Sequence, residues 1–410
     1  MSIFNDAMMI IDSAIKSALP DSAVKKALES ADFGGRKIHL VAIGKAGWQM
    51  ANAAYEQLGD RLADGMVITK YGHSKGAIGN LRIFEAGHPV PDENTFAATA
   101  AAIEAAKLWG EDDAVLFLIS GGGSALFEMP LISGDELQDL TNQMLACGAD
   151  IVEMNKIRKR LSAVKGGRFA ELCAPAKVFS VILSDVLGDP VDMIASGPAY
   201  PDSSSCADAL NIVSKYGLKL SEQALALLNR ETPKSLDNVE THITGSVRQL
   251  CESAREKCIE LGYEPIILTD MLSCVAREAG SFLAAIAKTY AGSGRQLAFI
   301  AGGETVVKLT GNGLGGRNQE LALSAAAGID GLSNVAVFSV GSDGTDGPTD
   351  AAGGYVDGGT AATLRGKGVS IDRVLAENDS YHALEKCGGL IITGTTGTNV
   401  NDLSVLLIRA

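Results

Sequence analysis

Short apolar runs rich in β-branched residues alternate along the whole chain with longer stretches of helical spacing. This alternation is typical of βαβ units, and it predicts an α/β fold with a mostly parallel sheet. The sequence does not fix the order of the strands. We expect strands at residues 37–43, 65–69, 81–86, 114–120 and 177–184, and then at 264–270, 296–302, 306–310, 335–340, 389–394 and 403–409.

The length of the chain, 410 residues, predicts two domains, because it exceeds what one hydrophobic core usually serves. The stretch 229–241 separates the two sets of expected strands, and it is polar and poor in large apolar residues. We therefore expect an N-terminal α/β domain over residues 1–235 and a C-terminal α/β domain over residues 236–410.

The overall charge is −14, from 35 Lys and Arg against 49 Asp and Glu, which argues against nucleic acid or an anionic membrane as a partner. Seven scattered cysteines form no C-x-x-C pair, so we expect neither disulfides nor a zinc site, and a cytoplasmic location. The sequence contains no run of 18 apolar residues, so we expect no transmembrane span. Residues 1–20 carry Asp6 and Asp12 and are read as a surface helix.

Small and polar residues follow seven of the expected strands directly. In open α/β sheets the ligand crevice lies outside the carboxyl ends of the strands, so these loops predict a binding cleft. Lys45 follows the strand at 37–43, where a lysine either neutralises a phosphate or carboxylate or simply ends a strand in solvent. The strand at 114–120 leads into an expected anion-binding loop, formed by Ser120, Gly121, Gly122, Gly123 and Ser124.

A basic stretch over residues 154–170 stands out in this acidic chain. Apolar residues recur in it at helical spacing, so we expect one helix with cations on its other faces and with Gly166 and Gly167 at its end. Such a run is commonly a solvated face, but six cations favour a phosphate or carboxylate partner. These cations are Lys156, Arg158, Lys159, Arg160, Lys165 and Arg168.

Carboxylates follow two further strands. Asp185 comes after the strand at 177–184, and Asp343 and Asp346 come after the strand at 335–340. Such side chains hold Mg²⁺ or accept a hydroxyl proton, although aspartate is also ordinary in turns. His88 lies in another strand-exit loop, where it is either a binding residue or one that fixes the loop.

The loop over residues 311–316 formally matches the dinucleotide fingerprint G-x-G-x-x-G. Arg317 stands at the start of the following helix, where its guanidinium can form a fork on a phosphate. Several aspartates follow the next strand, whereas a ribose needs only one carboxylate. The segment therefore favours phosphoryl transfer over a nicotinamide cofactor.

Taken together, the motifs resemble the class II glycerate kinases, the glycerate 2-kinase family whose C-terminal part is called the MOFRL domain. The resemblance runs nearly end to end. It rests on AIGKAG, GHPVPDENT, LISGGGSAL, NKIRKRLSAVKGGR, SDVLGDPVDMIASGP, AGGET, GLGGRNQELAL, GSDGTDGPTDAAGG, NDSYHAL and GTTGTNVNDL. It implies transfer of the ATP γ-phosphate to the 2-hydroxyl of D-glycerate, with Mg²⁺ or another divalent cation. It also implies two α/β domains facing an active-site cleft, the first Rossmann-like with a mostly parallel sheet.

The resemblance implies that Lys45 and Arg317 are catalytic, one from each domain. Asp185 or Asp343 would then hold the metal or receive the hydroxyl proton, with Asp346 as a further metal ligand. We expect the loop from Ser120 to Ser124, Arg160 and His88 to bind the substrate. The residues expected to bind the nucleotide are Glu304, Gly313, Gly315, Gly316 and Asn318.

Two alternatives stay open at this point. An NAD(P)H-dependent hydroxypyruvate reductase would place its cofactor on the loop at 311–316 with Asp343 on the ribose. A ligand-binding protein without catalysis would use the same strand exits. The sequence leaves a homodimer open as well.

Overall fold

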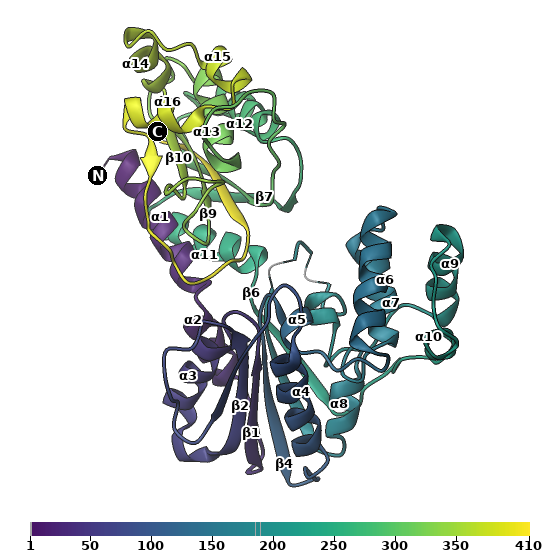
Figure 1. The fold of residues 1–410 in the computed structure, drawn as a ribbon. Coiled ribbons are helices and arrows are strands. Elements are labelled where there is room, and N and C mark those ends of the chain that lie inside the picture. Colours follow the sequence, from purple (N-terminus) through teal and green to yellow (C-terminus); the bar gives the residue numbers. More distant parts are fainter. Residues whose placement is uncertain (1, 185, 189) are drawn as a thin grey trace. The chain divides into compact units, whose positions relative to one another are not determined.

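The computed structural model describes residues 2–184, 186–188 and 190–410 and divides into two compact units. The parallel-sheet unit contains residues 23–184 and 190–244, and the mixed-sheet unit contains residues 2–22, 186–188 and 245–410. Each unit has its own six-stranded sheet with helices packed on it, so the expected α/β class is confirmed (Figure 1). The N-terminal helix belongs to the mixed-sheet unit, whereas the expected division had placed residues 1–22 in the N-terminal domain.

The parallel-sheet unit is built from alternating strands and helices. Its strands are β1 (Lys37–Ile43), β2 (Leu62–Lys70), β3 (Arg82–Ala86), β4 (Asp113–Ile119), β5 (Lys177–Leu183) and β6 (Val239–Gly245). Its helices are α2 (Pro20–Glu29), α3 (Gly47–Leu58), α4 (Glu93–Ala106), α5 (Gly123–Leu126), α6 (Gly134–Ala146), α7 (Ile151–Arg160), α8 (Arg168–Cys173), α9 (Cys206–Tyr216) and α10 (Glu222–Leu228), with short 3₁₀ turns η1 (Gly59–Arg61) and η2 (Ile194–Ser196).

The strand order in this unit is β3-β2-β1-β4-β5-β6. The pairs β3–β2, β2–β1, β1–β4 and β4–β5 are parallel, which is the Rossmann-like arrangement expected from the sequence. Six of the seven residues of β1 are buried, because helices cover both faces of the sheet. The order reverses between β1 and β4, which is the position where doubly wound sheets bind their ligands.

A helical subdomain of α6, α7, α9 and α10 packs around its own apolar cluster beside this sheet. The prediction of one helix over residues 154–170 is wrong. Helix α7 ends at Arg160, and Ser162 forms an isolated β-bridge with Pro130 before α8 begins at Arg168. Gly166 and Gly167 have positive φ angles of 59° and 85°, but they lie in the turn between the two helices.

The mixed-sheet unit also alternates strands and helices. Its strands are β7 (Glu264–Leu272), β8 (Leu297–Gly303), β9 (Val335–Gly341), β10 (Gly353–Asp357), β11 (Leu390–Ile391) and β12 (Asp402–Ile408). Its helices are α1 (Ile3–Ser17), α11 (Val247–Glu260), α12 (Ala276–Tyr290), α13 (Arg317–Gly328), α14 (Thr360–Gly366), α15 (Ile371–Ala376) and α16 (Ser380–Cys387). None of the helices in the described part of the chain is both long and apolar enough to cross a membrane.

The second sheet differs from the parallel arrangement that the sequence suggested. Its order is β11-β10-β9-β12-β8-β7, and only β7 and β8 are parallel neighbours. Strand β12 is antiparallel to both β8 and β9, so its first residue, Asp402, lies opposite Gly303 and Gly341 at the carboxyl ends of those strands. The amino-terminal end of β12 therefore lies at the same end of the sheet as the carboxyl ends of β8 and β9.

The expected strand at 306–310 is wrong, since only Val306 takes part in an isolated bridge. Strands β6 and β10 were missed, because β6 is largely polar and β10 is short and begins with two glycines. Helices α12 and α13 pack against each other and share an apolar cluster with β8, β9 and β12. The expected N-terminal helix is confirmed as α1, which packs on α11.

Candidate active site

The exits of β1 and β4 are hydrogen-bonded to each other. The backbone N–H of Lys45 donates to the carbonyl of Gly121 at 2.9 Å, and the N–H of Ala46 donates to the Ser120 hydroxyl at 3.1 Å. Gly44 has a φ of 106°, and a Cβ there would overlap Ser120, so only glycine allows the two loops to approach this closely. The loops after β1 and β4, where the strand order reverses, thus form one continuous surface.

Lys45, Gly122 and His88 lie together on this surface. A Cβ on Gly122 would lie 3.3 Å from Cγ of Lys45 and 3.0 Å from Nε2 of His88, which places both side chains beside the glycine. His73 donates from Nδ1 to the Lys45 carbonyl at 3.0 Å, and the Thr69 hydroxyl donates to the Gly44 carbonyl at 3.0 Å. Three elements expected from the sequence therefore meet here.

The loop from Ser120 to Ser124 is fixed from within the protein. The Ser124 hydroxyl lies 3.0 Å from the Ser196 hydroxyl, which in turn donates to Oδ1 of Asn155 at 2.9 Å. Since Ser196 has one proton and gives it to Asn155, Ser124 is the donor of the first bond. Ala195 and Ser196 both have positive φ angles, of 51° and 61°, which is strained for residues other than glycine.

Sequence reasoning missed Ser196 and Asn155 as supports of this loop. Both residues lie in motifs quoted above, Asn155 in NKIRKRLSAVKGGR and Ser196 in SDVLGDPVDMIASGP, but the local pattern gave neither of them a role. The carbonyl of Ser124 also accepts from Nζ of Lys165 at 2.8 Å. Lys165 is fully buried and pairs with Glu128 at 2.9 Å, and burial lowers the pKa of Lys165 to about 8, against the opposing charge of Glu128.

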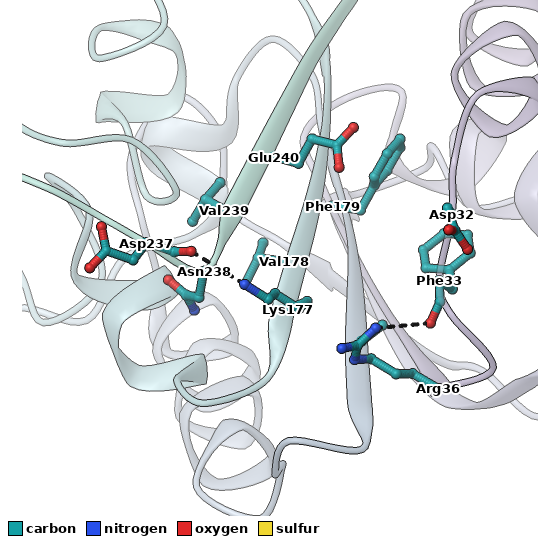
Figure 2. Close-up of a pocket in the computed structure, with 11 residues that line it drawn as sticks. Asp32, Phe33, Arg36, Lys177, Val178, Phe179, Asp237, Asn238, Val239 and Glu240 are labelled. Carbon is teal, nitrogen blue, oxygen red and sulfur yellow. Dashed lines mark hydrogen bonds between the residues drawn. The ribbon is translucent and has the colours of Figure 1, made fainter.

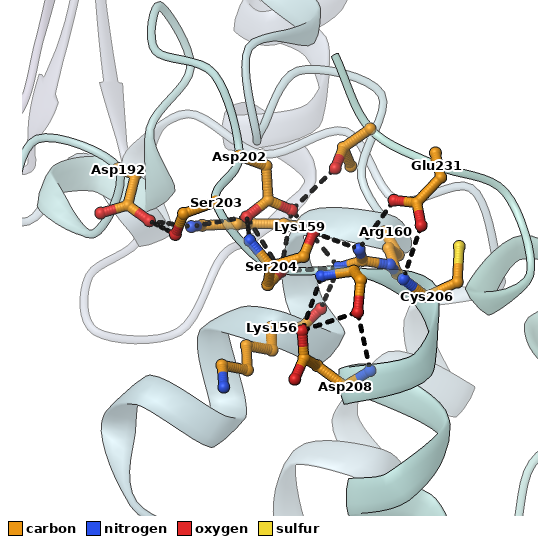
Figure 3. Close-up of polar contacts among 12 residues, drawn as sticks. Lys156, Lys159, Arg160, Asp192, Asp202, Ser203, Ser204, Cys206, Asp208 and Glu231 are labelled. Carbon is orange, nitrogen blue, oxygen red and sulfur yellow. Dashed lines mark hydrogen bonds and ion pairs between the residues drawn. The ribbon is translucent and has the colours of Figure 1, made fainter. Parts of the chain in front are cut away.

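Arg160 is buried among the protein's own polar groups. Its guanidinium is completely buried, and it donates to Asp202, to the hydroxyl and carbonyl of Ser204 and to Glu231 at 2.8 to 3.3 Å (Figure 3). Lys159 beside it is equally buried and lies between Asp192 and Asp202 at 3.1 and 3.2 Å. The expected substrate role of Arg160 is replaced by a structural one, because the protein's own groups hold its guanidinium.

Asp202 is the centre of this buried network. Burial acts to raise its pKa, but the charge of Lys159 and hydrogen bonds from Ser204 and Thr232 hold the pKa of Asp202 below its ordinary value. The network joins α7 to the loops at 202–204 and 231–234. It therefore accounts for Lys159 and Arg160 as structural cations of this helix.

In the mixed-sheet unit, Arg317 begins α13 and is held by two carboxylates. Its Nε and Nη2 donate to the two oxygens of Asp402 at 2.6 and 3.0 Å, and its Nη1 donates to Oε1 of Glu304 at 2.7 Å. Burial raises the pKa of Asp402, and Arg317 opposes that rise. Burial acts to lower the pKa of Arg317, but the bond to Asp402 raises it above its ordinary value. Sequence reasoning missed Asp402, because functional residues of parallel sheets follow the carboxyl ends of strands, whereas Asp402 begins a strand.

Asp346 caps the start of α13. One oxygen accepts from the Asn318 N–H at 3.1 Å, and the other accepts from the Gln319 N–H at 2.9 Å. Burial raises the pKa of Asp346 to about 6, although these hydrogen bonds act to lower it. Asn318 is itself buried, and its Oδ1 accepts from Ser339. Hydrogen bonds inside the fold thus occupy both residues, which argues against the metal and nucleotide contacts expected of them.

The glycines of the 311–316 loop make room for the protein's own chain. A Cβ on Gly313 would lie 2.6 Å from the Glu377 carbonyl oxygen, and a Cβ on Gly315 or Gly316 would overlap Ser380 or Asp346. The N–H of Gly313 donates to the Glu377 carbonyl at 2.8 Å. The glycine spacing therefore reflects packing against residues 377–380, and it gives no phosphate cradle at Gly313.

The two expected metal ligands that the structure describes, Asp343 and Asp346, belong to no cluster that could hold a metal ion. Within the described residues, no three His, Cys, Asp or Glu side chains lie close enough together to hold a metal ion. Asp343 is partly exposed, and its Oδ1 accepts from the Thr345 N–H at 2.9 Å. Asp185 lies outside the described residues.

A cavity of about 310 Å³ lies at the other edge of the parallel sheet, at the amino ends of β4 and β5 (Figure 2). Phe33, Arg36, Lys177 and Phe179 are among the residues that line it. Ligands of doubly wound sheets bind at the carboxyl ends of the strands. This cavity is therefore not part of the candidate active site around Lys45.

Comparison with known proteins gives the family of the chain. Residues 6–229 match a domain of unknown function, DUF4147, and residues 297–402 match the MOFRL family. The chain is 53% identical to the D-glycerate 2-kinase of Thermotoga maritima over 98% of this chain and 97% of that protein. The chain belongs to the glycerate 2-kinase family.

A crystal structure of a glycerate kinase from Thermotoga maritima superposes with a TM-score of 0.92 at 53% identity, covering 98% of this chain and 99% of that one. A protein of Agrobacterium vitis named a putative hydroxypyruvate reductase is 39% identical over 97% of this chain and 93% of its own length. Both clusters of this glycerate 2-kinase family member lie in the matched regions: Lys45 and the Ser120 loop in the first, Glu304, Arg317 and Asp402 in the second.

Proposed function

We propose that the protein transfers the γ-phosphate of ATP to the 2-hydroxyl of D-glycerate, giving 2-phosphoglycerate and ADP. The observation that carries this proposal is the 53% identity over nearly the whole chain to a D-glycerate 2-kinase. The positions of Lys45 and Arg317 support it, since each lies at the functional edge of its own sheet. Phosphoryl transfer asks the protein mainly for positioning and charge neutralisation, and these two side chains supply positive charge.

In this proposal Lys45 and Arg317 stabilise the negative charge on the phosphoryl oxygens in the transition state. Lys45 acts as a compact point charge, and Arg317 as a planar fork. Removing one such fixed donor typically costs on the order of 10² to 10³ in rate. The rigid backbone around Lys45 supports this role, because a pre-placed charge needs no reorganisation during the reaction.

The Ser120 to Ser124 loop and His88 are our candidates for binding D-glycerate. The loop offers backbone N–H groups suited to a small carboxylate, whereas its two hydroxyls donate within the protein, Ser120 to the Ile43 carbonyl and Ser124 to Ser196. The bonds from Ser124 to Ser196 and from Lys165 to the Ser124 carbonyl hold its end in place. Asp185, although outside the described residues, stays our candidate for the acceptor of the hydroxyl proton.

A divalent cation such as Mg²⁺ would enter with the phosphates of ATP, where it needs only one or two protein carboxylates. Asp343 fits this role, because its carboxylate is partly exposed. Asp346 does not fit it, because both of its oxygens accept hydrogen bonds from the start of α13. The ion would neutralise charge between the β- and γ-phosphates.

The alternative, an NAD(P)H-dependent hydroxypyruvate reductase, is weaker. It needs a cofactor pyrophosphate against the glycines at 311–316, and the space beside Gly313 is filled by residues 377–379. The name of the Agrobacterium vitis relative favours it, but that relative is more distant than the D-glycerate 2-kinase.

Two parallel incubations test the proposal. The protein is mixed with D-glycerate, ATP and Mg²⁺, and ADP release is followed; separately it is mixed with hydroxypyruvate and NADH, and NADH oxidation is followed. We expect ADP release that depends on D-glycerate and no oxidation of NADH. Oxidation of NADH without ADP release would reject the kinase in favour of the reductase.

We also propose a cytoplasmic location, which is supported by the seven cysteines, each within the described part of the chain, being free thiols. Light scattering at several concentrations tests whether it forms a homodimer.

A further inference from the structure

The two carboxylates that hold Arg317 differ in burial. Asp402 binds the Nε and Nη2 edge of the guanidinium, and its side chain is only 6% exposed. Glu304 binds Nη1 alone, and its side chain is 47% exposed. One partner is therefore embedded in the protein, while the other lies at the surface.

Asp402 and Glu304 also differ in how firmly the backbone holds them. Asp402 is the first residue of β12 and is paired on both sides, opposite Gly303 in β8 and Gly341 in β9. Glu304 follows the last residue of β8, and its long side chain reaches outward from there. Exposed ion pairs contribute little to stability, so the contact of Glu304 with Arg317 breaks at small cost, whereas the contact of Asp402 does not.

The charge of this group opposes the binding of an anion while Glu304 stays in contact with Arg317. One guanidinium stands against two carboxylates, so the group as a whole is negative when both are ionised. An approaching phosphate meets this repulsion, and it finds the Nη1 edge of Arg317 already occupied by an oxygen of Glu304. A phosphate oxygen that takes the place of Glu304 keeps Nη1 hydrogen-bonded and brings more negative charge to the arginine.

We propose that Glu304 is an internal competitor for phosphate at the Nη1 edge of Arg317, and that Asp402 is the positioning residue that keeps the guanidinium in place when phosphate displaces Glu304. The exchange applies to any polyphosphate, and only the identity of that ligand as ATP rests on the proposed function. Glu304 thus sets the negative charge that a ligand needs in order to bind Nη1 of Arg317, because a ligand with little charge does not displace it.

Three variants test the exchange. Glu304→Gln removes the competing charge. Glu264→Gln is a matched control, because Glu264 is also exposed and paired with an arginine, Arg295, in the same unit. It stands at the opposite end of the sheet, in register with Leu297 at the start of β8. Asp402→Asn removes the charge of the anchor at nearly constant shape.

Binding of tripolyphosphate and of ADP is measured by calorimetry, at low and high salt, without D-glycerate. We expect Glu304→Gln to bind both about fivefold more tightly than wild type, with a smaller gain at high salt, and Glu264→Gln to bind as wild type does. Asp402→Asn should bind about tenfold more weakly. In turnover, Glu304→Gln should lower KM for ATP, whereas Asp402→Asn should lower kcat, a split that a general loss of stability does not produce.

Unchanged or weaker polyphosphate binding by Glu304→Gln would overturn the competitor role, and wild-type binding and kcat in Asp402→Asn would overturn the positioning role. If Asp402→Asn does not fold, the two glutamate variants decide the competitor role, since both sites are exposed. Tighter binding in Glu304→Gln without any phosphorylation of D-glycerate by wild type would reject the proposed function and keep this inference. Phosphorylation by wild type without tighter binding in the variant would do the reverse.

Discussion

The backbone N–H of Lys45 donates to the carbonyl of Gly121 at 2.9 Å, and this bond joins the exit of β1 to the exit of β4. Because the strand order reverses between these two strands, the bond lies at the point where doubly wound sheets bind their ligands. The lysine backbone is therefore fixed by the same loop that we propose to bind D-glycerate.

Replacing Lys45 tests its charge apart from its backbone. We expect Lys45→Met to lower kcat/KM for D-glycerate by about 10² to 10³, because a fixed positive charge on the transition state is lost. The unfolding midpoint should stay the same. Tryptophan fluorescence reports it, since Trp48 and Trp109 both lie in the parallel-sheet unit. The control is Lys37→Met at the other end of β1, and equal losses in both variants would contradict a specific role.

Gly44 tests the joining of the two loops. We expect Gly44→Ala to destabilise the parallel-sheet unit by more than about 2 kcal/mol in urea unfolding, because a positive φ and a clash with Ser120 add together. Gly35→Ala is the matched control: Gly35 has a φ of 77° and nothing within 4 Å of a new Cβ. A similar cost at both positions would mean that backbone strain alone matters and that the contact with Ser120 does not.

Arg160 distinguishes a structural role from substrate binding. We expect Arg160→Met to lower the free energy of unfolding by about 3 to 5 kcal/mol, because Asp202 and Ser204 lose their buried contacts with the guanidinium, although Asp202 keeps its ion pair with Lys159. The KM for D-glycerate of the folded fraction should stay near that of wild type. A KM raised tenfold with stability unchanged would restore the substrate role expected from the sequence.

The raised pKa of Asp346 makes the stability of the mixed-sheet unit depend on pH. Burial raises its pKa in the folded state to about 6, whereas the unfolded carboxyl titrates near 3.8. Between these values the folded state binds more protons than the unfolded state, so stability falls as pH rises from about 4 to 6. We expect wild type to lose stability relative to Asp346→Asn over this window, by up to about 1.4 kcal/mol per pH unit, and the difference to be flat above pH 7. Thermal unfolding followed by circular dichroism measures it, and a difference that grows in favour of wild type would contradict the assignment.

The strand exits of the parallel-sheet unit could be predicted because parallel strands put function at one edge. Lys45, Ser120 and His88 follow strands that the hydrophobic pattern marks clearly, and the structure brings them together. Asp402 could not be found in this way. It starts a strand, and it reaches the functional edge only because β12 is antiparallel to its neighbours.

Arg160 and the glycine loop show where local patterns mislead. A run of cations reads as a surface, yet Arg160 is buried because Asp202 and Glu231 come to it from distant parts of the chain. The spacing of glycines at 311–316 reads as a cofactor loop, yet Gly313 is needed because residue 377 packs against it. In both cases the cause is a tertiary contact, which no local pattern contains.

The position of the new phosphate tests the central claim most directly. The reaction of D-glycerate with ATP is coupled to enolase, which accepts 2-phosphoglycerate as its substrate, and formation of phosphoenolpyruvate is followed by absorbance. The account predicts phosphoenolpyruvate in step with ADP release, with no other enzyme added. ADP release without phosphoenolpyruvate, restored only when phosphoglycerate mutase is added, would show phosphorylation at the 3-hydroxyl and contradict it.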